Sequence, residues 1–254
     1  MDFFKRVFGD QTRIVTGIGL IAVVLLIGII DNFFLTWALL GAAFMFSFFE
    51  AMKLFKIENN TLYFYAVVLW LVAAFYPNPD DLLFVVLIIY ASILAYQGDF
   101  DKKLFLPFLY PTASFLFLLT LYNDFGMMSL LWILVVVAGS DIGAYFTGKA
   151  IGKTKFSPTS PNKTLEGVAG GIVAAVILGG MVGTHFVSLQ TALLISMLVS
   201  LASIFGDLYE SYLKRQAGVK DSGALFPGHG GMLDRVDGYL FGGVILLILL
   251  RGIA

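Results

Sequence analysis

The stretch Arg13–Ile30, RIVTGIGLIAVVLLIGII, decides the fold class, and Asp31-Asn32 separates it from a second run, Phe33–Phe49, FFLTWALLGAAFMFSFF. A helix needs about 20 mostly apolar residues to cross the roughly 30 Å hydrocarbon core of a bilayer. Because similar runs recur along the whole chain, we predict nine membrane-spanning helices. They are Arg13–Ile30, Phe33–Phe49, Thr61–Tyr76, Leu82–Tyr96, Phe105–Tyr122, Met127–Thr147, Gly167–Phe186, Thr191–Ser211 and Gly238–Leu250.

The composition agrees with an all-α polytopic membrane protein. Of 254 residues, 59% are hydrophobic and 13% are charged, against about 25% charged in a soluble domain, and the mean hydropathy is +0.91. These values exclude a soluble globular enzyme, a disordered chain and a nucleic-acid binder with a basic face. The chain has no cysteine and two histidines, which excludes disulfides, thiolate chemistry and Cys- or His-rich metal sites.

The basic residues indicate the orientation. Cytoplasmic loops of membrane proteins carry an excess of Lys and Arg, and here basic connections alternate with connections that hold none. Of the 16 Lys and Arg residues, Arg251 alone falls on the other side. We therefore predict a cytoplasmic N-terminus and an external C-terminus. The first run lacks an A-x-A type cleavage site, so we expect a retained helix and not a signal peptide.

The polar segments predict a division of labour within one membrane domain, residues 1–254. Residues 1–126 are expected to be mainly scaffold. Residues 127–254 form the expected catalytic half, with polar cytoplasmic loops at 148–166 and 212–237. The small-residue pairs Gly167/Gly171 and Gly179/Gly183 favour close helix packing. We expect that packing to be within one chain, with a dimer contact as the alternative.

Two acids lie in or near predicted spans, where burying a charge costs about 2.5–3.5 kcal/mol on insertion scales. These are Asp141 and Asp207. Such acids face a bundle interior or a water-filled cavity; the alternative is an interfacial acid, hydrated or paired with a lysine. Asp207, Glu210, Ser211 and Lys214 are spaced i, i+3, i+4, i+7 and so share one helix face, where Glu210 could simply pair with Lys214.

The segment 220–237 combines acids, cations and glycines. Glycines let backbone N–H groups approach an anion, and Asp234 and Asp237 share a face if their stretch is helical. Carboxylates without a His or Cys cluster suit Mg²⁺. Taken singly, the Gly-rich loop could be a turn and His229 a loop hydrogen-bonder. In the other loop, Ser160 is the predicted N-cap with Pro161 at the first helical position, and Lys163 beside that N-terminus suits an anion.

These residues carry a resemblance. The segment 211–237, SYLKRQAGVKDSGALFPGHGGMLDRVD, resembles the signature of the phosphatidate cytidylyltransferases, the CDP-diacylglycerol synthases, at all its spacings. The stretches GDLYES (206–211), SPNKTLEG (160–167) and DIGAY (141–145) also fit. A signature of this length with many fixed polar positions is highly specific, and the resemblance is sharp over Gly139–Asp237.

The resemblance implies a nine-span enzyme of phospholipid biosynthesis, a homodimer in the cell inner (plasma) membrane with its site facing the cytoplasm. It would convert CTP and phosphatidate to CDP-diacylglycerol and pyrophosphate, with Mg²⁺ and with or without a monovalent cation such as K⁺, and would bind no nucleic acid. The implied catalytic residues are Asp207, Lys214, Asp221, Asp234 and Arg235; the substrate-binding residues are Lys163, Glu166, Ser211, Arg215, Lys220, His229 and Gly230; and the metal ligands are Asp207 and Asp234, with Asp237 and Asp141 as further candidates.

Three other functions remain open. A polyprenol kinase or an ether-lipid synthase also brings CTP to a membrane lipid, but the long signature favours the diacylglycerol enzyme. A transporter would use intramembrane acids as an ion pathway, although no inverted repeat is evident. A non-catalytic scaffold leaves the polar cluster without a purpose.

Overall fold

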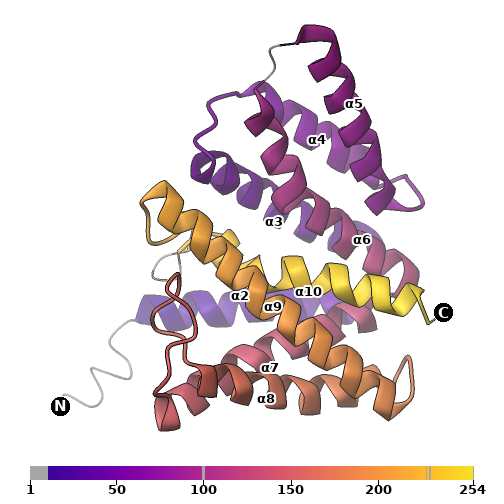
Figure 1. The fold of residues 1–254 in the computed structure, drawn as a ribbon. Coiled ribbons are helices and arrows are strands. Elements are labelled where there is room, and N and C mark those ends of the chain that lie inside the picture. The colour runs from indigo at the N-terminus through magenta and orange to yellow at the C-terminus, as the bar shows by residue number, and fades with distance from the viewer. Residues whose placement is uncertain (1–10, 99–100, 227, 229, 254) are drawn as a thin grey trace.

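The structure, a computed structural model, describes residues 11–98, 101–226, 228 and 230–253, with side chains described from residue 15 onward. Every regular element in this part of the chain is a helix (Figure 1). The long helices are α2 (Gln11–Ile30), α3 (Phe33–Leu54), α4 (Thr61–Ala73), α5 (Leu82–Gln97), α6 (Ala113–Phe125), α7 (Met127–Ile151), α8 (Leu165–Gly183), α9 (Leu189–Ala217) and α10 (Leu233–Arg251). Short helical turns are η1 (Pro79–Asp81), η2 (Lys102–Phe105) and η3 (Phe108–Thr112).

The helices have the length and surface of membrane spans. Within the described chain, six stretches are long and apolar enough to cross a bilayer: α3, Pro79–Gln97, Lys102–Phe125, α7, α8 and α9. Val15–Ile30 and Thr61–Ala73 are shorter apolar helices, and α10 has charged residues in its first turns. Large apolar side chains such as Ile29 and Phe75 lie exposed, as lipid-facing residues do. The protein is therefore an all-α polytopic membrane protein.

Helices α7 to α10 pack as successive neighbours, α7 on α8, α8 on α9 and α9 on α10, in the lower half of Figure 1. Glycines make these contacts close. A β-carbon at Gly171 would lie 2.6 Å from the Ser140 carbonyl oxygen, and one at Gly183 would overlap the Trp132 ring. The predicted packing of the α8 glycines within one chain is confirmed, because small residues let backbones approach.

At the two polar loops the flanking helices extend further than hydropathy predicted, so both loops are shorter. By contrast, α4 ends at Ala73 and not at Tyr76. α9 continues to Ala217 and α10 begins at Leu233, so the predicted loop 212–237 is reduced to residues 218–232. The loop predicted at 148–166 is reduced to 152–164. Hydropathy marks the part of a helix that contacts hydrocarbon, whereas the backbone hydrogen bonds of these helices continue through polar residues. Gly218, with φ of 78°, ends α9 in the left-handed conformation that favours glycine.

Arg251, the one cation predicted on the external side, joins three elements at that end of the bundle. Its guanidinium pairs with Asp80 of η1 at 2.6 Å and with Asp124 of α6 at 2.7 Å. Asp80 also accepts a hydrogen bond from the Thr120 hydroxyl at 3.0 Å. These contacts fix the last turn of α10 against α6, so that the polar first turn of α10 is held at the opposite end.

Candidate functional site

The predicted site residues gather where the C-terminal part of α9, the loop 218–232, the first turn of α10 and the loop 152–164 meet. Three of these segments carry the signature, and the loop 152–164 joins them through Lys163. In Figure 1 the loop between α9 and α10 lies at the left end of the bundle, beside the loop that precedes α8. The contacts between named side chains, described below, establish which residues meet.

Lys214 is the centre of a buried ion-pair cluster. Its ammonium lies 2.5 Å from Glu210 Oε2, one helical turn away, and 2.7 Å from Asp234 Oδ1 of α10. The Lys214 side chain is 11% exposed and that of Glu210 is fully buried. The predicted i, i+4 pair is therefore present, and the same lysine also reaches across to a second helix. Such buried charges are stable only together, since removing one partner leaves the others uncompensated.

The other carboxylate oxygen of Asp234, Oδ2, is surrounded by hydrogen-bond donors of the loop 218–232. Oδ2 accepts hydrogen bonds from the backbone N–H of Ser222 at 2.9 Å and of Gly231 at 2.7 Å, and the Ser222 hydroxyl lies 2.9 Å away. Gly230 has φ of 80°, and a β-carbon there would meet the Asp234 carboxylate. In the structure the Gly231 N–H of this loop donates to the protein's own Asp234 carboxylate. The approach of these N–H groups to a phosphate stays a prediction.

Asp207 forms the second acid–lysine pair of the site. Its carboxylate pairs with Lys163, from the loop before α8, and accepts a hydrogen bond from the Ser211 hydroxyl at 3.3 Å. The Asp207 and Lys163 side chains are 28% and 27% exposed. This pair is therefore partly accessible to solvent, whereas the Lys214 cluster is almost completely buried. Lys163 and Asp207 are 44 residues apart in the sequence. Their contact is the pairing with a lysine that the sequence leaves open as the alternative for Asp207.

Asp237 and Asp141 lie close to this pair. A β-carbon at Gly206 would be 2.5 Å from the Asp237 carbonyl oxygen, so α9 and α10 cross in near contact beside Asp207. Asp237 is half-buried beside the charges of Asp207 and Asp141. Asp234 and Asp237 share the first turns of α10, as predicted for a helical stretch. Three helices therefore direct carboxylates at one region.

The loop 152–164 corrects one prediction. Ser160 and Pro161 do not begin a helix; Thr164 is the N-cap of α8, and its hydroxyl accepts from the Gly167 N–H at 3.1 Å. The backbone before it folds back on itself, with Phe156 N–H donating to Lys163 O at 2.9 Å. This pairing places Ser160-Pro161 in the turn between the two paired segments, where no helix can start.

The remaining predicted residues lie at the edge of the cluster. Glu166 accepts hydrogen bonds from the Thr154 hydroxyl and the N–H groups of residues 153 and 154. Arg215 donates to the Val219 carbonyl at 2.9 Å. Lys220, Asp221 and Arg235 are exposed. His229 lies outside the described residues.

One buried acid of the site was not predicted. Glu50 of α3 is 3% exposed and accepts hydrogen bonds from Ser222, Met232 and Leu233, more than 170 residues away. The signal was an acid directly after an apolar run. The predicted span ends at Phe49 and so leaves Glu50 outside it, whereas α3 continues to Leu54.

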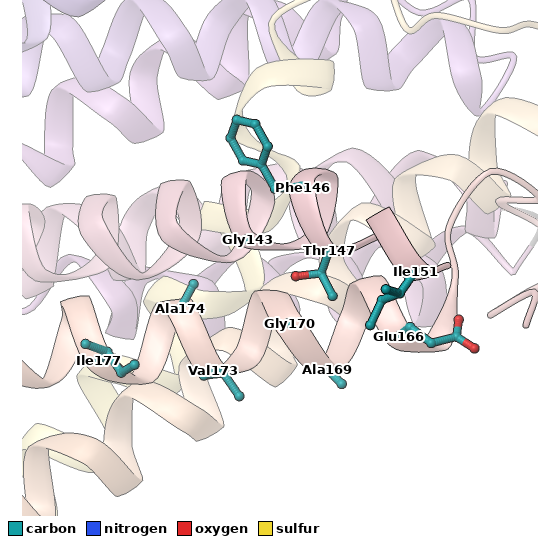
Figure 2. Close-up of a pocket in the computed structure, with 10 residues that line it drawn as sticks. All are labelled: Gly143, Phe146, Thr147, Ile151, Glu166, Ala169, Gly170, Val173, Ala174 and Ile177. Carbon is teal, nitrogen blue, oxygen red and sulfur yellow. The ribbon is translucent and has the colours of Figure 1, made fainter. Parts of the chain in front are cut away.

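A separate hollow of about 640 Å³ lies between α7 and α8 and does not coincide with this cluster. Figure 2 shows Gly143 and Thr147 of α7 facing Gly170 and Ala174 of α8, with Glu166 at one end. Glu166 is the one charged residue in its lining, and its carboxylate is bound to the loop backbone. The hollow is apolar, and the acid–lysine pairs belong to the α9–α10 side.

Comparison with known sequences decides the family. Residues 11–253 match the model of the Cytidylyltransferase family. The chain belongs to this family. The cytidylyltransferase is 47% identical to a protein of Helicobacter pylori strain J99 over 97% of this chain and 94% of that protein. It is 35% identical to one of Thermotoga maritima over 80% and 83% of the two chains, and 37% identical to one of Bacillus subtilis over 77% and 68%. All three relatives are named phosphatidate cytidylyltransferase.

The cytidylyltransferase site has the donor set for a hard divalent cation. Among the described residues no group of three His, Cys, Asp or Glu side chains is close enough to enclose a metal ion. Mg²⁺, however, is usually held by one or two carboxylates together with water and substrate phosphates. Asp207 and Asp234 are carboxylates of this kind, and each pairs with a lysine ammonium group. The residues present therefore fit magnesium.

Proposed function

We propose that this cytidylyltransferase is a CTP:phosphatidate cytidylyltransferase that makes CDP-diacylglycerol for phospholipid synthesis. The observation that carries the proposal is the pair of acid–lysine contacts, Lys163–Asp207 and Lys214–Asp234, built from the signature at one end of a membrane bundle. The names of its relatives support the same substrates.

The reaction joins two anions. An oxygen of the phosphatidate phosphate attacks the α-phosphorus of CTP in line, the bond from that phosphorus to the bridging oxygen breaks, and pyrophosphate leaves with the bonding electrons. The attacking phosphate is already largely ionised near pH 7, given a second pKa of about 6. No side chain has to act as a nucleophile, and we assign no general base.

Repulsion between the substrates is the main barrier that the site must remove. Each pair of like charges at about 4 Å costs about 4 kcal/mol at an effective dielectric constant of about 20. Lys163 and Lys214 bring positive charge to the cluster, and Arg215, Lys220 and Arg235 surround it at the exposed edge. In the proposed mechanism the lysines bind phosphate oxygens and hold the two reacting groups in line.

Magnesium completes the proposal. Asp207 and Asp234 would hold it, with Asp237 and Asp141 beside them, and a monovalent cation such as K⁺ could share the acids. A bound divalent ion neutralises charge on the phosphates and on the leaving oxygen. Asp234 Oδ2 is engaged by the loop backbone and Oδ1 by Lys214, so a cation held by Asp234 would share Oδ1 with the Lys214 ammonium or displace it.

The proposed enzyme is a homodimer, and each subunit has nine spans in the inner (plasma) membrane. Its site faces the cytoplasm, where CTP is found. This orientation is supported by the basic residues of the site, which lie at the end of the bundle opposite Arg251, Asp80 and Asp124. The cysteine-free chain allows a direct test. In host cells stripped of their outer membrane, an impermeant thiol reagent should label Asn78→Cys, and Gln216→Cys only after permeabilisation. The reverse result would invert the topology.

The activity test uses purified protein in detergent with radiolabelled CTP, phosphatidate and Mg²⁺. The proposal predicts labelled CDP-diacylglycerol and pyrophosphate in equal amounts, and no product from a folded Asp234→Asn variant. Product from a polyprenol or an ether lipid, but none from phosphatidate, would show that the acceptor is wrong. An active Asp234→Asn variant would refute the metal assignment while leaving the reaction standing.

A further inference from the structure

Glu50 connects the N-terminal helices to the signature loop. It lies in the last turns of α3, and only 3% of its surface is exposed although it carries a carboxylate. A buried carboxylate is costly unless donors surround it. Its donors come from the loop 218–232 and the start of α10, so its position is tied to the part of the chain that holds Asp234.

The Glu50 carboxylate acts as a remote cap of α10. The first N–H groups of a helix have no partner inside the helix, and Met232 at the N-cap position makes no side-chain cap of its own. Glu50 Oε1 accepts from the Met232 N–H at 2.9 Å and Oε2 accepts from the Leu233 N–H at 2.8 Å. A negative charge at a helix N-terminus is favourable. The direction and register of the α10 start therefore depend on Glu50.

Ser222 links Glu50 to Asp234. Its hydroxyl lies 2.8 Å from Glu50 Oε2 and 2.9 Å from Asp234 Oδ2. A serine hydroxyl has one proton, so at any moment it donates to one of the two carboxylates. The Ser222 N–H donates to Asp234 in addition. The loop is thus held between the two acids, and a shift of Glu50 would reach Asp234 through one residue.

Two loop glycines are shaped by the same carboxylate. A β-carbon at Gly223 or at Gly231 would overlap Glu50 oxygens. Both glycines belong to the signature segment, and the close approach of Glu50 explains why no larger side chain fits there. The loop is packed around Glu50, with the carboxylate as part of its interior.

We propose that Glu50 is a positioning residue of this site: through Ser222 and the N-terminus of α10 it sets the place of the Asp234 carboxylate, without touching substrate. The role in the reaction rests on the proposed function. Residues that orient metal-binding carboxylates typically change metal affinity or activity about 10- to 100-fold when they are replaced. This places one functional residue in the half of the chain that was expected to be mainly scaffold.

The variants are Glu50→Gln, Ser222→Ala and the control Ser47→Ala. Gln keeps the shape but presents an NH₂ group to one of three donors. Ser222→Ala keeps both backbone hydrogen bonds of Glu50 and the Ser222 N–H bond to Asp234, and removes the hydroxyl that contacts both carboxylates. Ser47 is buried one turn earlier in α3, and its hydroxyl has no hydrogen-bond partner among the described residues. Ser47→Ala therefore tests the effect of altering buried α3 without altering the loop.

Two readouts separate positioning from stability. For folded Glu50→Gln and Ser222→Ala we expect kcat to fall about tenfold or more, and the Mg²⁺ concentration for half-maximal rate to rise, with the KM for phosphatidate unchanged. Independently of activity, trypsin should cut Glu50→Gln faster after Lys220, a site in the loop. The proposal would be overturned if both variants kept the wild-type kcat, Mg²⁺ dependence and rate of tryptic cleavage. It would also be overturned if Ser47→Ala changed these three quantities as much as the other variants do.

The two proposals can fail separately. If wild type makes no CDP-diacylglycerol, the proposed function fails, while the trypsin experiment still reports on the Glu50 contact. If Glu50→Gln does not fold, Ser222→Ala decides: an altered Mg²⁺ dependence supports positioning, and an unaltered one refutes it.

Discussion

Replacing Lys214 by methionine is the sharpest test of the buried cluster. Methionine keeps the unbranched stem and its packing but removes the ammonium that lies 2.5 Å from Glu210 and 2.7 Å from Asp234. Two carboxylates, with side chains 0% and 6% exposed, would face each other without a cation. Breaking a buried pair in this way costs about 3–5 kcal/mol. We expect a melting temperature about 6–20 °C lower, taking about 2–4 °C per kcal/mol for a chain of this size.

A double variant separates stability from catalysis. In Lys214→Met/Glu210→Gln the uncompensated Glu210 charge is gone, while Asp234 keeps its donors Ser222 and Gly231. We therefore expect the double variant to regain about half or more of the lost melting temperature, because its remaining acid is hydrogen-bonded. Activity should stay low, since the cation proposed to bind phosphate is missing. Glu210→Gln alone is the control for any direct effect of that residue.

The assay pairs thermal melting in detergent with CDP-diacylglycerol formation on the same preparations. Unchanged melting of Lys214→Met would show that the two ion pairs contribute no net stability, against their burial. Recovery of both melting temperature and kcat in the double variant would show that Lys214 serves the fold alone. Either result would refute the reasoning that joins the buried cluster to the reaction.

Two further perturbations address the loop and the far end of the bundle. Gly231→Ala would force a methyl group into the Glu50 carboxylate and should reduce kcat as Glu50→Gln does. The control is Gly19→Ala, whose β-carbon would meet no described atom within 4 Å. This control should keep the wild-type kcat in the same assay. Arg251→Leu removes the contacts to Asp80 and Asp124 and should lower stability by about 1–3 kcal/mol in a melting experiment, with kcat unchanged; a loss of kcat at full stability would place that end of the bundle in the mechanism.

The helices could be predicted because hydropathy is a local property. Each predicted run overlaps a helix of the structure. The spacing of Glu210 and Lys214 gave their pairing as one alternative without knowledge of the fold, and the structure contains it.

The predicted run Phe105–Tyr122 is not one helix, because the backbone of Tyr110 is not helical and α6 begins at Ala113. The other errors were at helix ends. Both Ser160 and Thr164 are good N-cap residues, and only the backbone pairing of Phe156 with Lys163 decides between them.

The contacts that build the site lie beyond such local rules. Lys163 meets Asp207 across 44 residues and Glu50 meets Ser222 across 172. Contacts between residues so far apart in the sequence depend on how the helices cross. The crossings in turn depend on close glycine contacts such as that of Gly206 with Asp237. The resemblance supplied the signature residues, but Glu50 is outside the signature. A buried acid in a predicted scaffold becomes visible only when its donors are placed.

The charge of the paired side chains predicts that metal and nucleotide bind together. Lys163 and Lys214 face Asp207, Glu210 and Asp234, so acids outnumber cations in these pairs and a triphosphate meets a site with little net attraction. One divalent cation reverses the balance, and each charge pair at about 4 Å then contributes about 4 kcal/mol at an effective dielectric constant of about 20. We expect CTP binding, measured by calorimetry in detergent, to weaken about 100-fold or more when Mg²⁺ is removed with EDTA. Equal CTP affinity with and without Mg²⁺ would show that the exposed basic residues at the edge, and not the acid–lysine cluster, hold the nucleotide.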